Sequence, residues 1–195
     1  MSIHKFDEAV RDWRRALQYL EEGNRRYREN RVVARNVSVE ERRALTEGQN
    51  PFAMVITCSD SRVAPEVFFD QGLGDLFVAR NVGNTVNAMV LGAIEFAVGF
   101  LNVPLVVVVG HSHCAAVINA FKGSAFSGNL QAVMEEIHPA VRHCENEDAA
   151  IRANIAHAVN QIRENGVVEK AGAMVTGAFY DIASGEVVWL DCGKD

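Results

Sequence analysis

The chain has 195 residues, and 49% of them are hydrophobic, so one compact domain can bury a core without help from disulfides or metal. Its 19 basic and 25 acidic side chains give a net charge of −6, and no block of Lys or Arg stands out, which argues against a nucleic-acid or anionic-membrane partner. Four cysteines are too few for a disulfide scaffold, and the charged, periodic N-terminus is unlike a signal peptide. We therefore expect a globular, cytoplasmic protein.

The first fifty residues predict a helical arm. Apolar side chains spaced by three or four positions predict an amphipathic helix, and they are Phe6, Val10, Trp13, Leu17 and Leu20. Ser38 to Glu41 fits a capping box that opens a second, short helix, which Gly48 can end. The apolar stripe can pack on its own domain or on a partner subunit, and the residue pattern favours neither.

Beyond residue 50, predicted strands alternate with predicted helices. The predicted strands are 53–57, 75–79 and 105–109, followed by a hairpin of 172–181 and 186–191. The predicted helices are 65–70, 86–100, 114–121, 129–142 and 147–165. This order predicts an α/β fold, in which a mostly parallel central β-sheet is flanked by helices and ends in a C-terminal β-hairpin with an antiparallel edge strand. We expect an N-terminal helical arm over 1–50 and an α/β domain over 51–195.

Residues 88–110 are hydrophobic enough to resemble a membrane span. Glu95, Asn102 and Pro104 interrupt this stretch, and its composition changes to a β-branched run over 105–109. We therefore predict a buried helix, a short turn and a strand that Gly110 ends, and no membrane partner.

Metal-ligand side chains follow two of the predicted strands. Cys58 comes directly after strand 53–57, and His111 and Cys114 follow strand 105–109. Ligands of open α/β sheets bind beyond the carboxyl ends of the strands, so these side chains converge if the two strands are neighbours. Two thiolates and one imidazole suit Zn²⁺. Three protein ligands leave a fourth position, which is typical of a catalytic zinc that makes water a nucleophile near neutral pH.

Asp60 and Arg62 lie within the same CSDSR turn as Cys58. Asp60 is placed to accept the proton of such a water, and Arg62 to hold the carboxylate by charge-assisted hydrogen bonds. Alternatively, Asp60 occupies the fourth metal position itself and closes the site. We interpret His113 as a solvated loop side chain.

At these residues the chain resembles the β-class carbonic anhydrases. The matching segments cover most of 48–120, and they are GQNPFAMVITCSDSRVAPEVFFDQGLGDLFVARNVGN, GAIEFAV and VVVVGHSHCAAV. The resemblance implies one zinc ion per subunit on Cys58, His111 and Cys114, with Asp60 and Arg62 as the catalytic dyad that orients zinc-bound water. It also implies the reversible hydration of CO₂ to bicarbonate and a proton by zinc-bound hydroxide.

The same resemblance implies a substrate pocket and a homo-oligomer. Gln49 is expected to hydrogen-bond the substrate or bicarbonate, with Phe77, Val82 and Phe96 as apolar walls. In family members the N-terminal helices clasp a partner in a dimer, which is often paired into a tetramer. The alternative function is a carbonyl sulfide or carbon disulfide hydrolase on the same scaffold. Enzymes of the carbonyl sulfide group often carry the motif CMDAR, whereas this chain has CSDSR, which favours CO₂ as the substrate.

Overall fold

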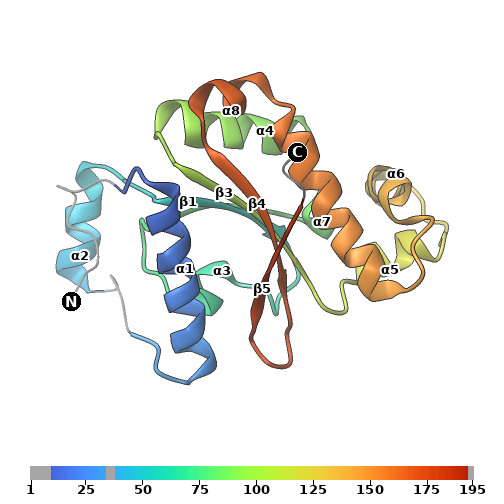
Figure 1. Cartoon of the computed structure of the whole chain (residues 1–195), viewed down its shortest axis with the longest axis horizontal. Coiled ribbons are helices and arrows are strands. Elements are labelled where there is room, and N and C mark those ends of the chain that lie inside the picture. The colour runs from blue at the N-terminus through green and yellow to red at the C-terminus, as the bar shows by residue number, and fades with distance from the viewer. Residues whose placement is uncertain (1–9, 34–37, 193–195) are drawn as a thin grey trace.

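The computed structural model describes residues 10–33 and 38–192 and places one sheet between two layers of helices (Figure 1). The strands lie in the order β2-β1-β3-β4-β5. Their bounds are β1 (Ala53–Cys58), β2 (Leu76–Asn81), β3 (Leu105–His111), β4 (Met174–Tyr180) and β5 (Val187–Leu190). Neighbouring strands are parallel except β5, which pairs antiparallel with β4 at the edge. The predicted α/β fold and its C-terminal hairpin are confirmed.

Helices connect the strands. They are α1 (Trp13–Arg28), α2 (Val39–Ala44), α3 (Pro65–Phe68), α4 (Ala88–Glu95), α5 (Ala115–Phe121), α6 (Asn129–Val141), α7 (Glu147–Arg163) and α8 (Gly166–Ala171). Three short turns complete the set, and they are η1 (Leu45–Glu47), η2 (Val82–Asn84) and the π-helical η3 (Phe96–Phe100). Helix α8 was not predicted. Asn165 caps its start, directly after the end of α7. Among the described residues, no helix combines the length and apolar character needed to cross a membrane.

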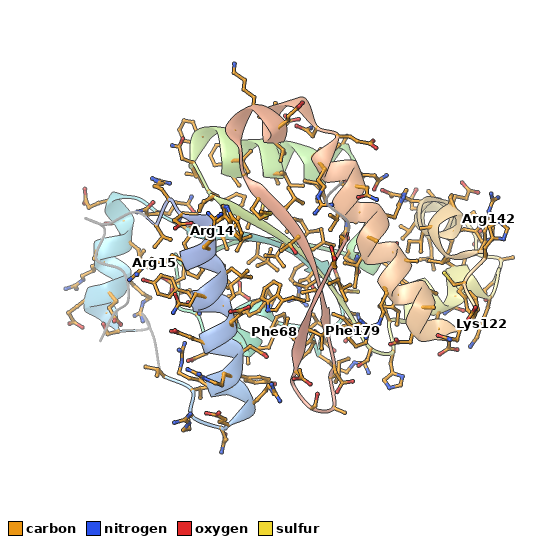
Figure 2. The ribbon with its side chains drawn as sticks, viewed as in Figure 1. Arg14, Arg15, Phe68, Lys122, Arg142 and Phe179 are labelled. Atoms are coloured by element: carbon orange, nitrogen blue, oxygen red, sulfur yellow. The ribbon has the colours of Figure 1, made fainter. Side chains whose placement is uncertain are left out.

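Both faces of the sheet are buried, so β1 and β3 are buried along their whole length. One face packs against α4 to α8 and the other against α1 and α3. Phe179 lies in the first of these two cores and Phe68 in the second, whereas Arg14, Arg15, Lys122 and Arg142 lie at the periphery (Figure 2). A strand covered on both faces tolerates a continuous apolar run, which explains the composition of 105–109.

Helix α1 packs on the sheet of its own chain, with Ala16 and Leu20 fully buried. Its first residue is Trp13, because the side chain of Asp12 accepts a hydrogen bond from the Arg14 N–H and caps the helix. Val10 therefore precedes the helix instead of belonging to it, and Phe6 lies outside the described residues. Contact of the arm with a partner subunit stays a prediction.

The predicted capping box is confirmed. The Ser38 hydroxyl accepts the Glu41 N–H at 3.1 Å, and the Glu41 carboxylate accepts the Ser38 N–H at 3.0 Å. The helical segment continues through η1 and ends at Gly48. The segment therefore ends five residues before β1 begins at Ala53.

The prediction that Gly110 ends the third strand is wrong, because β3 continues to His111. A Cβ atom on Gly110 would lie 2.6 Å from Cγ1 of Ile155 on α7. Glycine is therefore needed for close packing of α7 on the sheet, not for a turn. As a result, His111 stands on the last residue of a buried strand instead of in a loop.

Helix α1 also approaches the end of α3 very closely. A Cβ atom on Gly23 would lie 1.7 Å from the carbonyl oxygen of Phe69. Beside it, the buried Asn24 side chain donates hydrogen bonds to the carbonyls of Phe68 at 3.0 Å and Gly185 at 2.8 Å. It also accepts the Val187 N–H at 3.1 Å. The pair Gly23-Asn24 thus joins α1 to both α3 and the hairpin.

We expect Gly23→Ala to lower the free energy of unfolding by at least about 2 kcal/mol. Alanine stabilises an isolated helix by about 1 kcal/mol relative to glycine. If Gly23→Ala nevertheless destabilises the protein, the cause is the clash with the Phe69 carbonyl. The measurement is denaturant unfolding at a fixed protein concentration. Gly166→Ala is the control, because Gly166 is also helical but nothing lies within 4 Å of its added Cβ, and it should leave stability unchanged or raise it slightly. Equal stability of wild type and Gly23→Ala would contradict the close approach.

Candidate metal centre

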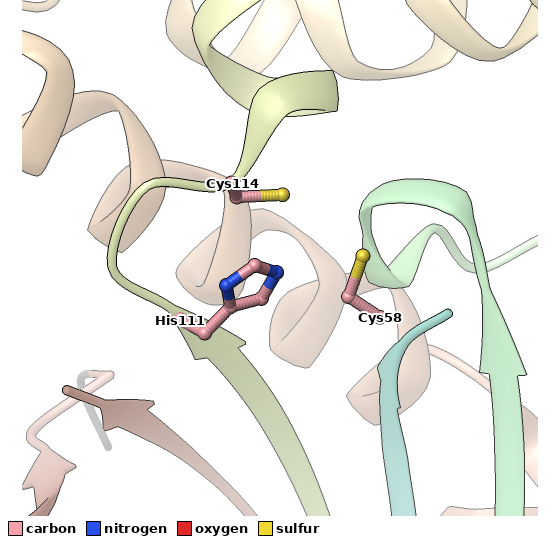
Figure 3. A group of neighbouring side chains, drawn as sticks. All are labelled: Cys58, His111 and Cys114. Carbon is pink, nitrogen blue, oxygen red and sulfur yellow. The ribbon is translucent and has the colours of Figure 1, made fainter. Parts of the chain in front are cut away.

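The parallel pairing of β1 with β3 brings Cys58, His111 and Cys114 together. Thr57 pairs with Val109, so both strands end at the same edge of the sheet. The two sulfur atoms and an imidazole nitrogen all lie within 4.8 Å of one another and face a shared space (Figure 3). The three residues are at most 6% exposed. The predicted convergence of these residues is thus present in the folded chain.

The imidazole of His111 is oriented to bind a cation. Its Nδ1 lies 2.9 Å from the carbonyl oxygen of Ser112. A carbonyl only accepts hydrogen bonds, so Nδ1 carries the proton and Nε2 keeps its lone pair. Nε2 is buried and has no hydrogen-bond partner within the described part of the chain. A buried acceptor without a partner beside two thiols fits a metal ligand.

Backbone N–H groups surround both sulfur atoms. Those of Gly83 and Asp60 act to lower the pKa of Cys58, and those of the first turn of α5 act to lower the pKa of Cys114. A hydrogen bond between the two thiols lowers the pKa of Cys58 against the opposing effect of burial. The same bond, together with burial, raises the pKa of Cys114. The opposite shifts mean that Cys58 ionises more readily than Cys114.

Asp60 and Arg62 form a two-pronged ion pair at the rim. Nε of Arg62 donates to Oδ1 of Asp60 at 2.9 Å, and Nη2 donates to Oδ2 at 2.6 Å. This interaction holds the pKa of the Asp60 carboxyl well below its usual range, so the group stays ionised. Nη2 also lies 3.4 Å from the carbonyl oxygen of His113, which links the two loops. The Asp60 oxygens are not among the clustered ligand atoms.

Two residues outside the predicted site also shape it. Arg80 on β2 donates from Nε to the Cys58 carbonyl at 3.1 Å and from Nη2 to the Asp60 carbonyl at 2.8 Å. Gly83 has a φ of 73°, and a Cβ atom there would lie 2.6 Å from Cδ1 of Ile137. The only signal for Gly83 in the sequence is a glycine just after a strand. Its effect on the pKa of Cys58 depends on how β2 pairs with β1, because that pairing brings residue 83 next to the end of β1.

The predicted substrate residues are only partly assembled. The rings of Phe77 and Phe96 lie 5.9 Å apart, and Phe96 stacks on Phe100 at 4.9 Å. Val82 and Phe96 remain 42% and 44% exposed. Gln49 lies on the surface before β1, and its side chain makes no hydrogen bond with a described residue. The structure thus pairs Phe77 with Phe96 and leaves Gln49 and Val82 open to solvent.

Known proteins share this sequence pattern. The family model for carbonic anhydrase matches residues 53–187. Carbonic anhydrase 2 of Mycobacterium tuberculosis is 37% identical over 192 residues, with 90% of this chain and 92% of that protein covered. A carbonic anhydrase of Mycolicibacterium smegmatis is 36% identical over 188 residues, which cover 88% of this chain and 90% of the relative.

Solved structures share the fold. The β-carbonic anhydrase CafA of Aspergillus fumigatus superposes with a TM-score of 0.74 at 26% identity, covering 94% of this chain and 92% of that one. A tetrameric β-carbonic anhydrase of Sordaria macrospora gives a TM-score of 0.71 at 28% identity, covering 77% of this chain and 86% of that one. Sequence and structure agree, and the chain belongs to the β-carbonic anhydrase family.

Proposed function

We propose that this protein catalyses the reversible hydration of CO₂ to bicarbonate and a proton, with one zinc ion per subunit held by Cys58, His111 and Cys114. The observation that carries the proposal is the buried cluster of three ligand atoms within 4.8 Å, in which Nε2 of His111 has no partner among the described residues. Two sulfurs and one nitrogen are a ligand set that zinc prefers. Membership of the carbonic anhydrase family supports CO₂ as the substrate.

Zinc, when bound, supplies the Lewis acidity that lets a water molecule ionise near neutral pH. Two thiolates cancel the formal charge of the ion and weaken this effect, so a nearby group that accepts a hydrogen bond from the water and orients it is needed. The ionised Asp60 carboxylate is that hydrogen-bond acceptor; because its pKa is held low, the proton that the water releases passes to solvent or buffer. It holds the O–H of the reacting water and so turns an oxygen lone pair toward the carbon of CO₂.

Arg62 sets where the Asp60 carboxylate lies. Both carboxylate oxygens are bonded to the guanidinium, which favours a carboxylate that stays off the metal and leaves the fourth position to water. Arg62 therefore acts through Asp60, by keeping it ionised and correctly oriented. The link from Arg62 to His113 keeps this pair aligned with the strand that carries His111.

Apolar side chains suit the substrate, because CO₂ is small and has no net dipole. Phe77, Val82 and Phe96 are proposed as the walls against which CO₂ lies, supported by the pairing of the two rings. Gln49 is proposed to donate its amide N–H to an oxygen of the substrate or of bicarbonate. Its exposed position before β1 leaves its amide free for that contact.

We also propose that the protein is a homodimer or a dimer of dimers, with residues 1–50 clasping the partner. Large apolar side chains along η2, α4 and η3 are exposed, and they are Val82 at 42%, Met89 at 83%, Phe96 at 44% and Phe100 at 71%. Apolar side chains gathered in this way on one stretch are typical of a protein interface. The β-carbonic anhydrases of Sordaria macrospora are tetrameric, which supports the same arrangement here.

The proposed location is the cytoplasm. Cys58, Cys114, Cys144 and Cys192 are all free thiols. A zinc site with two cysteine ligands needs reduced sulfur, and the cytoplasm maintains it.

The function is tested by stopped-flow CO₂ hydration together with zinc stoichiometry. We expect wild type to hold one zinc per chain and to hydrate CO₂, with far lower turnover of carbonyl sulfide in a parallel assay. Cys58→Ser and Cys114→Ser should lose zinc and activity together, because serine is a poor zinc ligand. Cys144→Ser is the matched control, since Cys144 is not part of the ligand cluster and its thiol donates to the Ala140 carbonyl. A wild-type enzyme without zinc, or one that prefers carbonyl sulfide, would contradict the proposal.

Asp60→Asn should keep zinc but reduce kcat/KM for CO₂ by about 100-fold or more, because the amide keeps the shape but loses the ionised acceptor that orients the water. The measurement is stopped-flow hydration with metal analysis of the same sample. Glu66→Gln neutralises a nearby exposed carboxylate on α3 and should have no effect. Full activity of Asp60→Asn would show that this carboxylate has another role.

Phe100→Glu should shift the protein toward monomer, because a charge in an apolar interface is costly to bury. Sedimentation velocity at several protein concentrations measures this shift. The matched control is Val188→Glu, which places the same charge at an exposed apolar position on the edge strand β5. A wild type that sediments as a monomer would overturn the proposed oligomer.

A further inference from the structure

Ser112 joins the metal-ligand loop to the β4–β5 hairpin. It lies between His111 and the ligand Cys114, directly after the end of β3. Its N–H donates to the carbonyl of Tyr180 at 2.9 Å. Its hydroxyl accepts the N–H of Ile182, also at 2.9 Å. One serine thus holds two successive contacts with the start of the hairpin turn.

The carbonyl of the same residue holds the imidazole of His111. It lies 2.9 Å from Nδ1, and it is the acceptor that leaves the lone pair on Nε2. Because Ser112 is fastened to the hairpin on its N–H and hydroxyl sides, its carbonyl is fastened as well. A shift of this carbonyl would turn the ring and move Nε2 away from the two sulfurs.

The hairpin turn is itself well braced. Oδ1 of Asp181 accepts the N–H and the hydroxyl of Ser184, each at 2.7 Å. These bonds lower the pKa of the Asp181 carboxyl, and the nearby Ser112 hydroxyl lowers it further. On its other side the turn is held by Asn24 of α1, which bonds Gly185 and Val187. The hairpin is therefore a rigid support for Ser112.

We propose that Ser112 is a positioning residue for the metal: its hydroxyl fastens the ligand loop to the β4–β5 hairpin and so holds the His111 ring with Nε2 facing the sulfurs of Cys58 and Cys114. This inference rests on the proposed zinc site and extends it to a residue that touches neither substrate nor metal. Groups that orient a ligating histidine typically change metal affinity about 10- to 100-fold when they are lost.

The chain offers a matched pair of serines for the test. Ser112 follows the ligand His111, and Ser59 follows the ligand Cys58. In the described part of the chain, the Ser59 hydroxyl makes no hydrogen bond, whereas the Ser112 hydroxyl holds the hairpin. The two alanine variants thus remove the same atom at the same distance along the chain from a ligand.

Zinc affinity is measured by competition with a chromogenic chelator. Ser112→Ala should bind zinc about 10- to 100-fold more weakly than wild type, whereas Ser59→Ala should match wild type. Ser112→Thr keeps the hydroxyl and should restore most of the affinity. Circular dichroism of each variant confirms that the fold is retained. The absorption spectrum of the Co²⁺-substituted protein should change for Ser112→Ala alone, because it reports the ligand geometry.

Several results would overturn the inference. Wild-type affinity in Ser112→Ala, or equal weakening in Ser59→Ala, removes the role of Ser112 while the zinc site itself stands. If wild type fails to bind zinc, the proposed function fails and this inference fails with it. If Ser112→Ala does not fold, Asp181→Ala is measured in its place. It loosens the same hairpin and should weaken zinc binding several-fold, and an unchanged affinity would again overturn the inference.

Discussion

The parallel pairing of β1 with β3 is the constraint on which the site depends. The two strands are far apart along the chain, yet Thr57 pairs with Val109 and both strands end at one edge of the sheet. Helices cover both faces of these strands, so their ends have little freedom to move. Gly110 lets α7 pack directly on β3, one residue before His111. The positions of Cys58 and His111, the last residues of β1 and β3, are therefore set by the core of the domain. Only Cys114 is placed by the loop that follows β3.

Charge balance is the second requirement of such a site. Two sulfurs lie in the cluster and a carboxylate lies at its rim, and burying negative charge is costly unless donors face it. Backbone N–H groups face both sulfurs, and the Arg62 guanidinium faces Asp60. Arg80 adds two bonds to carbonyl groups of the same turn. The centre is thus prepared for a cation by backbone and arginine donors together.

Local patterns predicted the fold well where short-range chemistry decides the structure. The capping box at Ser38 and the apolar strands of the sheet are examples, because a cap and a continuous apolar run are both encoded by adjacent residues. Prediction was weaker where distant contacts decide. Gly110 was predicted to end a strand, but Ile155 of α7 explains why it continues. Helix α8 was not predicted at all, because the prediction ended the preceding helix at residue 165 and assigned no element to 166–171.

For the site, the sequence by itself determined the chemistry: two cysteines, one histidine and an Asp–Arg pair at the ends of two apolar strands. Residue type and spacing suffice for this, because ligand preference is a property of the side chains. Only the tertiary structure decided which nitrogen of His111 is free, since that depends on the Ser112 carbonyl. It also decided that α1 packs on its own sheet. Both facts come from contacts between segments distant in sequence or from backbone geometry, which no local pattern encodes.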